Sequence, residues 1–449
     1  MTDRTIVDEA LTIRGGHLWI EGCDTVELAQ RFGTPIYVVS EDQLRRNVRR
    51  IRSVLDQVWG GPIQLLPSIK ANFSLALRRI LNTEATGCDC FGPSELRAAL
   101  TTGVPPNLIS VNGSSKDAAI IETAIEAGAR ITLDSPREYN LVLETAQRLG
   151  KRATIRLRLR PDYRGLDQAS DFFPDLSIRV AADRYKPGIP SRDATAIGAL
   201  ALAAPEVELT GLMVHLGRHS AHADVWASMA KSFADLVADL CERWGGWRPR
   251  ELDIGGGFPS PRDPTSPLGE AAPSLDQTAG RAASSLRQRL EERGVDPTGI
   301  ILEAEPGRAL FADTGIHLSR VRSIKEQQEP TSWRWVETDT TEMFLADLLV
   351  EHAHFRPVVA SLADAAPTMT ADIVGISCGF DVLASQMELP SVAAGDVIAF
   401  LDTGAYQDAV AANFNALPRP GTVLVSGAQA RWVKRPETIA DVFARDIVE

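Results

Sequence analysis

Several reactive side chains stand where short apolar runs of the sequence end. Lys70 closes the apolar run 65–69, and an amine in that setting loses contact with water. Desolvation lowers the pKa of an ammonium group and favours the free amine that a Schiff-base lysine needs. Taken singly, such a residue is more often a cap, a turn or a satisfied core group. Together the run ends predict one site. The residues at the ends of the other apolar runs are Asp89, Asn112, Asp134, Arg158, His215 and Glu305.

Three consecutive glycines, Gly255, Gly256 and Gly257, follow another apolar run. Their bare backbone can approach a phosphate and present N–H donors to it. Their spacing is not that of the dinucleotide fingerprint, so it does not support a Rossmann-type NAD site. In the segment 305–308, Glu305 stands beside Gly307 and Arg308, so a carboxylate that can keep a heterocyclic nitrogen protonated lies near an anion-binding guanidinium. An amine, a phosphate cradle and such a carboxylate are the parts that pyridoxal phosphate requires.

The elements that must position these groups alternate along residues 61–312. Short β-rich runs are separated by amphipathic helical stretches such as 116–127 and 136–149, which is typical of βα units and a parallel sheet. Eight repeats predict an α/β fold with a TIM-like (β/α)8 barrel, and an open doubly wound sheet is the alternative. The eight predicted strands are 63–70, 87–91, 108–112, 130–134, 153–160, 209–217, 251–256 and 299–306.

The sequence pattern changes after the last repeat. Further strand-like runs follow one another without long helices, which predicts a C-terminal antiparallel β-domain. The opening segment, with a strand over 12–20 and a helix over 25–32, lies outside the repeats and is expected to pack with that domain. We therefore expect a barrel over 40–312 and a β-domain formed by 1–39 and 313–449. The predicted C-terminal strands are 315–325, 333–338, 371–376, 396–401 and 421–426.

The composition excludes several classes of function. The 449 residues carry a net charge of −12, which repels nucleic acid and anionic lipid. The most apolar long stretch, 196–214, contains Pro205, Glu206 and Glu208 and so predicts no membrane span. The first twenty residues lack an apolar core behind a basic start, so we expect a cytoplasmic protein. The five cysteines are too scattered for a disulfide framework or a paired zinc-finger spacing, and no metal is expected.

In their order, these motifs resemble those of the barrel-type pyridoxal-phosphate decarboxylases, the alanine racemase-like group that includes diaminopimelate and ornithine decarboxylases. The segment 68–72, Ser-Ile-Lys-Ala-Asn, is similar to the family's lysine motif, and 214–217, Val-His-Leu-Gly, to its histidine motif. The segments 33–35, 252–258 and 305–308 match as well. The resemblance implies that Lys70 carries pyridoxal phosphate covalently, that His215 stacks on its ring and that Glu305 pairs with its pyridine nitrogen. The remaining expected cofactor contacts are Asp89, Arg158, Gly217, Arg218, Gly255, Gly256, Gly257, Gly307, Arg308 and Tyr406.

Two C-terminal segments extend the resemblance. Residues 375–378, followed by Asp381, look like the family's catalytic-cysteine segment, and 402–406 look like its Gly-Ala-Tyr segment. The resemblance implies a homodimer with shared active sites, in which Cys378 of the other subunit protonates the substrate carbon after carbon dioxide leaves and Tyr406 helps to hold the cofactor phosphate. From residue type alone, Cys378 would more often be a buried structural cysteine. Racemisation needs an acid–base pair on opposite faces of Cα, so Cys378 favours decarboxylation.

The pattern departs from the family at the distal substrate pocket. Gly379 and Phe380 stand where diaminopimelate decarboxylases usually have Glu-Ser, and Asp347 begins the stretch where they have an arginine. The segment 351–354, Glu-His-Ala-His, instead resembles the Asp-His-Ala-His of ornithine decarboxylases. Arg218 stands where a phosphate-binding serine is common. We expect substrate contacts from Arg308, Asp347, Glu351, Gly379, Phe380 and Asp381.

These departures lead to a hypothesis about the substrate. Because the cofactor set is intact while the distal contacts are lost, the leading interpretation is decarboxylation of an acidic amino acid tethered to an acyl carrier protein, in specialised natural-product or antibiotic biosynthesis. A basic helical cluster at 45–52 could meet an acidic carrier. The alternative is a free small amino acid, namely ornithine, lysine or diaminopimelate, which Glu351 supports. A non-catalytic regulatory homologue is a further alternative, against which the retained Lys70, His215 and Glu305 argue.

Overall fold

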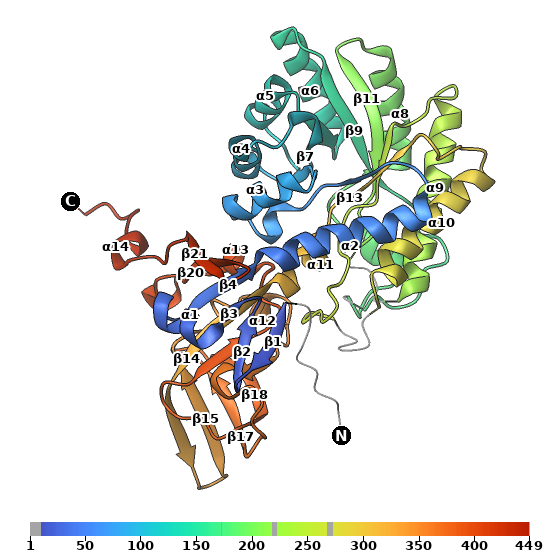
Figure 1. Cartoon of the computed structure of the whole chain (residues 1–449). Coiled ribbons are helices and arrows are strands. Elements are labelled where there is room, and N and C mark those ends of the chain that lie inside the picture. The colour runs from blue at the N-terminus through green and yellow to red at the C-terminus, as the bar shows by residue number, and fades with distance from the viewer. Residues whose placement is uncertain (1–9, 172, 218–221, 267–272, 449) are drawn as a thin grey trace. The chain divides into compact units, whose positions relative to one another are not determined.

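The computed structural model describes residues 10–448 except 172, 218–221 and 267–272, and the chain divides into two compact units (Figure 1). The barrel unit consists of Val48–Pro261 and Glu270–Leu310. The β unit consists of Met1–Asn47, Arg262–Gly269 and Phe311–Glu449. Residues 40–47, which the sequence analysis placed in the barrel, therefore fall in the β unit.

The barrel unit contains eight parallel strands that pair in the order of the chain. The last strand pairs with the first, and the ring closes where Gly87 N donates to Leu65 O (2.9 Å) and Asp89 N donates to Pro67 O (3.3 Å). The predicted barrel is thus confirmed, and a short strand, β10 (Ile189–Pro190), adds to β9. The eight strands are β5 (Ile63–Leu65), β6 (Cys88–Cys90), β7 (Ile109–Val111), β8 (Arg130–Leu133), β9 (Ala153–Arg160), β11 (Val207–Met213), β12 (Glu251–Asp253) and β13 (Ile301–Ala304).

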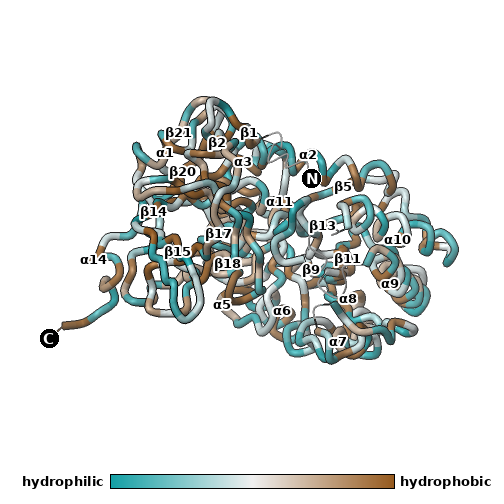
Figure 2. Tube along the Cα trace, turned by 90° about the horizontal axis from the view of Figure 1, so that it is seen from below, coloured by the Kyte–Doolittle hydropathy of each residue, from teal (hydrophilic) through white to brown (hydrophobic). Residues whose placement is uncertain are grey.

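Helices follow these strands and cover the outside of the barrel. In α5 (Ala118–Ala127) both ends have local signals: the Asp117 side chain accepts from Ile120 N at its start, and Gly128 ends the helix in the left-handed conformation. Figure 2 shows hydrophilic and hydrophobic residues mixed along the outer helices, as expected for helices with one buried face. The helices are α2 (Glu41–Trp59), α3 (Leu75–Thr83), α4 (Pro93–Thr102), α5 (Ala118–Ala127), α6 (Pro136–Leu149), α7 (Ile178–Arg184), α8 (Ser191–Ala203), α9 (Ala223–Arg243), α10 (Arg281–Glu292) and α11 (Arg308–Phe311).

Polar side chains fill the interior of the barrel. Along β9, the buried apolar residues Ile155 and Leu157 alternate with the arginines Arg156 and Arg158. Successive residues of a strand point to opposite faces, and Arg156 reaches Glu303 on β13, which is not a neighbour of β9 in the sheet. The arginines of β9 therefore point into the barrel, and its apolar residues face the helices.

The β unit contains a mixed sheet rather than a purely antiparallel one. β4 runs parallel to β20, and β15 runs parallel to β17, because long connections return the chain to the same end of the sheet. β19 pairs with both β14 and β16 beside the main path. The strands are β4 (Ile36–Ser40), β14 (Gly315–Gln327), β15 (Trp333–Thr338), β16 (Pro357–Val359), β17 (Met369–Val374), β18 (Val382–Leu389), β19 (Val397–Phe400), β20 (Gly421–Ser426) and β21 (Gln429–Lys434).

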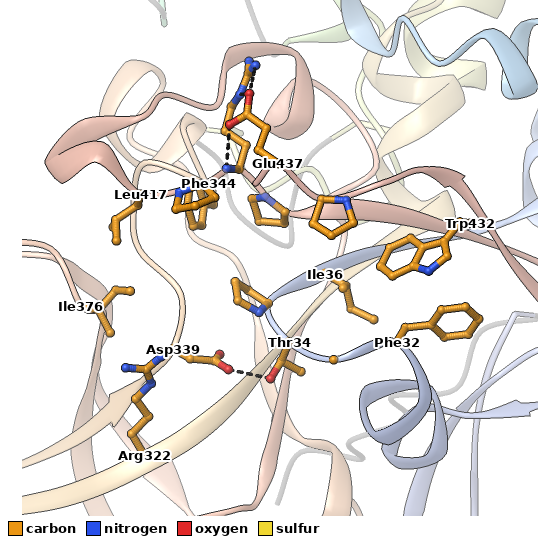
Figure 3. A pocket seen from close by; sticks show the side chains of 16 residues that line it. Phe32, Thr34, Ile36, Arg322, Asp339, Phe344, Ile376, Leu417, Trp432 and Glu437 are labelled. Carbon is orange, nitrogen blue, oxygen red and sulfur yellow. Dashed lines mark hydrogen bonds and ion pairs between the residues drawn. The ribbon is translucent and has the colours of Figure 1, made fainter. Parts of the chain in front are cut away.

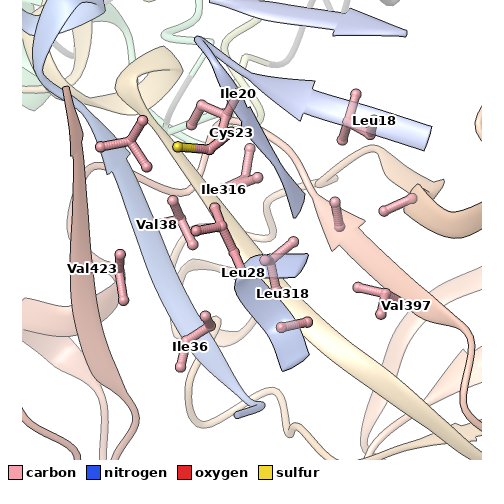
Figure 4. Packing of buried hydrophobic residues seen from close by; sticks show 14 of the residues in the cluster. Leu18, Ile20, Cys23, Leu28, Ile36, Val38, Ile316, Leu318, Val397 and Val423 are labelled. Atoms are coloured by element: carbon pink, nitrogen blue, oxygen red, sulfur yellow. The ribbon is translucent and has the colours of Figure 1, made fainter. Parts of the chain in front are cut away.

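The N-terminal segment is part of the core of the β unit. It forms β1 (Leu11–Arg14), β2 (His17–Ile20), β3 (Cys23–Asp24) and α1 (Thr25–Phe32) before entering β4. Figure 4 shows Leu18 and Leu28 from this segment packed with Ile316, Val397 and Val423 from the C-terminal half of the chain. The sequence analysis expected the opening segment to pack with the C-terminal domain, and this cluster contains residues of both. Among the described residues, no helix combines the length and the apolar character needed to cross a membrane.

His317 of β14 is a buried titratable group of the β unit, with its ring beside Tyr37 and Phe400. Its ring is fully enclosed, and its Nε2 lies 2.7 Å from Thr340 Oγ1. Burial lowers its pKa from 6.5 to about 3, because the charged ring would lose its hydration. Folded His317 therefore stays neutral over a pH range in which the unfolded residue takes up a proton.

This difference predicts a contribution to acid sensitivity. The free energy of unfolding falls as the pH is lowered from about 6.5 towards about 3, with a slope of about 1.4 kcal/mol per pH unit from this one group. We expect His317→Gln, which cannot take up the proton, to show a shallower loss of stability in urea unfolding across that range. His222→Gln, at a largely exposed site, is the control and should keep the wild-type slope. Equal slopes for wild type and His317→Gln would contradict the assignment.

Candidate active site

Lys70 does not end a long strand, as the sequence suggested, but lies in a short 3₁₀ turn, Ile69–Ala71, beyond β5. Regular pairing stops early because Pro67 has no N–H to donate, although Ser68 N still reaches Pro306 O at 3.2 Å. The Lys70 side chain is 49% exposed, so its removal from water is less complete than expected. Its Nζ lies 3.3 Å from Asp89 Oδ2, which makes a carboxylate rather than burial the main feature of its surroundings.

Asp89, on β6, anchors the lysine amine. It is 2% exposed and accepts hydrogen bonds from Ser68 Oγ (2.6 Å), Asn112 Nδ2 (2.7 Å) and Lys70 Nζ. Burial raises the pKa of Asp89, but the Lys70 charge and these hydrogen bonds outweigh burial and hold the pKa below its usual value. Asp89 is therefore a charged group that holds the Lys70 ammonium at the carboxyl end of the barrel strands.

Glu305, directly after β13, is joined to Asp89 through one amide. Asn112 Nδ2 donates to both Asp89 Oδ1 and Glu305 Oε1. Arg156 Nη2 also donates to Glu305 Oε1, at 3.1 Å. Burial, with added repulsion from Asp253 and Asp89, raises the pKa of Glu305 well above its usual value, and Arg156 partly opposes this. The sequence pattern marked Asn112 only because it ends an apolar run, and it did not single out Arg156.

The predicted glycines form a cradle of bare backbone. A Cβ at Gly256 would stand 2.2 Å from Glu305 O, and one at Gly217 would stand 2.3 Å from Gly256 O. Gly255 and Gly257 both have positive φ, at 71° and 85°. No side chain fits at Gly217 or Gly256, so the backbone here can come close to a phosphate.

His215 borders this cradle. Its ring is half-buried and its Nδ1 accepts a hydrogen bond from Gly256 N at 3.2 Å. Because Nδ1 is the acceptor, the proton of the neutral ring is on Nε2. A ring fixed in this way can pack against a flat ligand held by the glycines.

Two buried arginines complete the barrel side of the site. Arg158, on β9, is 8% exposed, and Arg308, at the start of α11, is 7% exposed. Arg158 has no carboxylate within ion-pair distance among the described residues, so its guanidinium remains available to an anion. Gly307 precedes Arg308 and is buried. Arg218 lies outside the described residues, so its predicted cofactor contact stays a prediction.

Cys378 lies in an exposed loop of the β unit. The residue-type expectation of a buried structural cysteine is wrong, whereas Cys23, Cys88, Cys90 and Cys241 are all buried. Asn415 makes two hydrogen bonds with Cys378. Its Oδ1 accepts from Cys378 N (2.9 Å), and its Nδ2 donates to Cys378 Sγ (3.3 Å). Sequence reasoning missed Asn415, which no motif marks.

Two residues assigned to the substrate instead hold loops together. Asp381 is 2% exposed, and its carboxylate accepts from Thr341 Oγ1, Glu342 N and Ser377 N. Asp347, at 3% exposed, accepts from Gln407 Nε2 at 3.0 Å. Because these carboxylates are buried and hydrogen-bonded, we correct their assignment from substrate binding to loop structure.

The other β-unit residues differ in exposure. Phe380 is 98% exposed, Gly379 beside it is exposed, and Glu351 is half-buried. Tyr406 adopts a left-handed conformation, with φ of 67°, immediately before α13 (Gln407–Val410). Their roles toward cofactor and substrate remain predictions.

The motif at 33–35 lies at a separate cavity of the β unit, of about 310 Å³ (Figure 3). Thr34 Oγ1 donates to Asp339 Oδ2 at 2.5 Å, and Trp432 meets Phe32 edge to face. Figure 3 shows these side chains around the cavity. None of the predicted site residues lines it.

Comparison with known proteins identifies the class. Residues 41–312 match the family model described as the pyridoxal-dependent decarboxylase, pyridoxal binding domain. The chain belongs to this family and is a pyridoxal-phosphate-dependent amino acid decarboxylase. Its residues fit the cofactor, since Lys70 supplies the amine, the glycine cradle takes a phosphate and Glu305 offers a carboxylate to a ring nitrogen.

The chain is also similar to several named decarboxylases. The chain is 28% identical to the diaminopimelate decarboxylase of Methanocaldococcus jannaschii, over 98% of this chain and 97% of that protein. It is 28% identical to that of Pseudomonas aeruginosa, over 97% and 98%. The M. jannaschii crystal structure in complex with L-lysine has a TM-score of 0.87 at 28% identity, covering 98% of both chains. The Vibrio vulnificus lysine/ornithine decarboxylase with putrescine has a TM-score of 0.72 at 20% identity, covering 90% and 98%, and shares the fold.

The position of Lys70 predicts how the cofactor is attached. We expect Lys70→Ala to abolish borohydride-stable attachment of pyridoxal phosphate and to remove turnover, because Lys70 is the amine that Asp89 holds at this end of the barrel. The measurement is the mass of the reduced protein. Lys151→Ala, at an exposed lysine whose Nζ donates to Glu126 O, should retain the full mass increase. A stable adduct on Lys70→Ala would remove Lys70 from this role.

Proposed function

We propose that this enzyme removes the α-carboxylate of a free amino acid that carries a second amino group, of the class of diaminopimelate, lysine and ornithine. The observation that carries this proposal is the acidic character of the loops around Cys378 in a chain whose relatives are named diaminopimelate decarboxylases. The tethered-substrate hypothesis has no counterpart among the names of the relatives. The free diamino acid, which the sequence left as the alternative, fits them better.

Glu342 supplies a carboxylate where the sequence indicated that one was lost. A Cβ at Gly379 would stand 2.9 Å from Glu342 Oε1, so the carboxylate occupies the space beside the glycine. Burial and the nearby Asp381 raise the pKa of Glu342, which shows that its charge lacks full compensation. We infer that Glu342 accepts the side-chain ammonium of the substrate.

The cavity next to Glu342 suits an aliphatic chain. It has a volume of about 470 Å³, and Leu348, Phe355 and Met387 are among the apolar residues that line it. A carboxylate at one side of an otherwise largely apolar cavity favours a ligand with a methylene chain and a terminal ammonium group. Glu351, half-buried after α12 (Asp347–Val350), adds to the acidic character of this part of the β unit.

Each residue of the site then has a defined task. Lys70 would hold the cofactor through its amine, and Asp89 orients that amine by accepting its hydrogen bond. Bound pyridoxal phosphate supplies a protonated ring that accepts electrons as the bond between Cα and the carboxylate breaks. Glu305 holds the proton at the ring nitrogen. Cys378 donates a proton to Cα after carbon dioxide has left.

We infer that a second copy of the chain covers the Cys378 loop. Phe380 is 98% exposed beside the exposed Cys378, and a bare aromatic side chain is costly in water. In a homodimer, each Cys378 would act at the site formed around the partner subunit's Lys70, and the Phe380 side chain would be buried between the subunits. Arg158, which forms no ion pair with a carboxylate among the described residues, is then left for an anionic group of cofactor or substrate.

Carbon dioxide release tests the proposed reaction. The purified, cofactor-loaded protein is given ornithine, lysine, diaminopimelate, aspartate or glutamate, and carrier protein loaded with aspartate or glutamate. We expect release from at least one free diamino acid and none from the acidic or tethered substrates. Release only from a loaded carrier would refute the proposal and restore the tethered-substrate hypothesis.

Glu342 is tested by its effect on substrate binding. We expect Glu342→Gln to raise KM for the diamino acid by about tenfold, with a smaller change in kcat, because a charge-assisted hydrogen bond is lost. Glu388→Gln, at an exposed position on β18, is the matched control and should keep the wild-type KM. An unchanged KM in Glu342→Gln would rule out this role.

Shared active sites predict complementation between two inactive variants. Lys70→Ala and Cys378→Ala homodimers should each be strongly impaired. When the two are unfolded together and refolded, mixed dimers contain one intact site, so we expect about one quarter of the wild-type activity to return. Recovery no greater than the sum of the separate variants would contradict a site built from two subunits.

A further inference from the structure

Arg156 is the centre of a buried charge cluster inside the barrel. Its side chain is fully enclosed, and its Nη2 lies 2.7 Å from Asp253 Oδ2 and 3.1 Å from Glu305 Oε1. Its Nη1 lies 2.6 Å from Glu303 Oε2, and its Nε donates to Thr132 Oγ1 at 2.7 Å. One guanidinium therefore contacts three carboxylates from two strand ends, β12 and β13.

A second arginine, Arg130, contacts two carboxylates of the same cluster. Arg130 Nη2 lies 2.6 Å from Glu303 Oε2, so the two arginines share one carboxylate oxygen. Arg130 Nη1 lies 3.2 Å from Glu251 Oε1, which also accepts from Thr210 Oγ1 at 2.5 Å. Arg130 has no contact with Glu305 among the pairs that the described residues form. It thus has the same chemistry as Arg156 but a different set of partners.

The cluster carries more carboxyl groups than cations. Its carboxyl groups outnumber its ammonium and guanidinium groups even when Lys70 is included. Burial of this excess raises the pKa values of Glu303 and Glu305. A protonated ring nitrogen at Glu305 would bring a positive charge that the cluster lacks. The carboxyl groups are Asp89, Glu251, Asp253, Glu303 and Glu305, and the cations are Lys70, Arg130 and Arg156.

We propose that Arg156 is a positioning residue that fixes Glu305 and keeps it charged toward the cofactor's ring nitrogen. Arg156 and Asn112 both donate to Oε1, which fixes this oxygen of the Glu305 carboxylate. This inference rests on the proposed role of Glu305. Arg156 acts through Glu305 and needs no contact with substrate.

The guanidinium geometry is necessary for this role. Arg156 uses Nη1, Nη2 and Nε on partners in different directions at the same time. A lysine ammonium is a single point charge and cannot span Glu303, Thr132 and Glu305. Arg156→Lys therefore keeps the charge of the cluster and loses the fixed orientation of Glu305.

The test measures cofactor binding without substrate. Pyridoxal phosphate is compared with an analogue in which a carbon atom replaces the ring nitrogen, by fluorescence titration of the apoenzyme. We expect wild type to prefer pyridoxal phosphate by at least about tenfold, since the analogue leaves Glu305 unpaired. Arg156→Met should lose most of this preference, and Arg156→Lys should lose part of it. Arg130→Met, which removes an equal charge from the cluster, should keep it.

A second readout reports the ring proton directly. With isotope-labelled cofactor in the holoenzyme, the NMR shift of the ring nitrogen should indicate the protonated form in wild type and Arg130→Met, and the unprotonated form in Arg156→Met. Because Arg156→Met leaves buried carboxylates without a counter-charge, it is also made together with Glu303→Gln, which removes one of those charges. The double variant should fold and still lack the ring proton.

The outcomes separate this inference from the proposed function. A protonated nitrogen and an intact preference in the double variant would overturn the role of Arg156, as would an equal loss in Arg130→Met. No preference in wild type would overturn it too, because Glu305 would then not meet the ring. A wild-type preference without carbon dioxide release from any diamino acid would refute the substrate proposal and leave Arg156 in place.

Discussion

The central physical constraint on the barrel is that its interior is charged. Barrels of this type are usually filled by layers of branched apolar side chains, whereas here Arg130, Arg156 and Glu303 meet in the middle. A buried charge costs several kcal/mol unless it is paired and hydrogen-bonded, so these three side chains depend on partners from other strands. The register of the strands follows from this, because a shift of β9 by one residue would turn its arginines against the helices and its leucines toward carboxylates.

The same constraint links the scaffold to the chemistry. A continuous network of hydrogen bonds runs from Arg156 through Glu305, Asn112 and Asp89 to Lys70. The groups expected to contact the cofactor therefore belong to the polar core of the barrel and are not additions to an apolar one. In the β unit the reactive loop is held differently, by the buried carboxylate of Asp381 and by the amide of Asn415.

Prediction from sequence succeeded where the signal was local. The order of strands and helices predicted the closed barrel. The run ends also marked Asp89 and Glu305, which Asn112 joins in the structure, while their roles toward the cofactor stay predictions. Prediction failed where the partner came from elsewhere in the chain. The carboxylate of Asp381 looked free for substrate, but three donors from neighbouring segments use it. Glu342 and Arg156 were missed because their roles depend on Gly379 and Glu305, to which no sequence spacing connects them. The parallel pairing of β4 with β20 was missed for the same reason.

The position of β4 has a consequence for the order in which the chain is made. This strand precedes the barrel unit in the chain, yet its neighbours in the sheet, β14 and β20, both follow the barrel unit. All of the barrel unit emerges in between and can fold before the β unit has its full set of strands. Until those strands are synthesised, the apolar side chains of Ile36 and Val38 lack the C-terminal residues against which they pack. A nascent chain that stalls before β14 is synthesised would thus present a folded barrel with an unpaired, aggregation-prone strand, β4, on its N-terminal side.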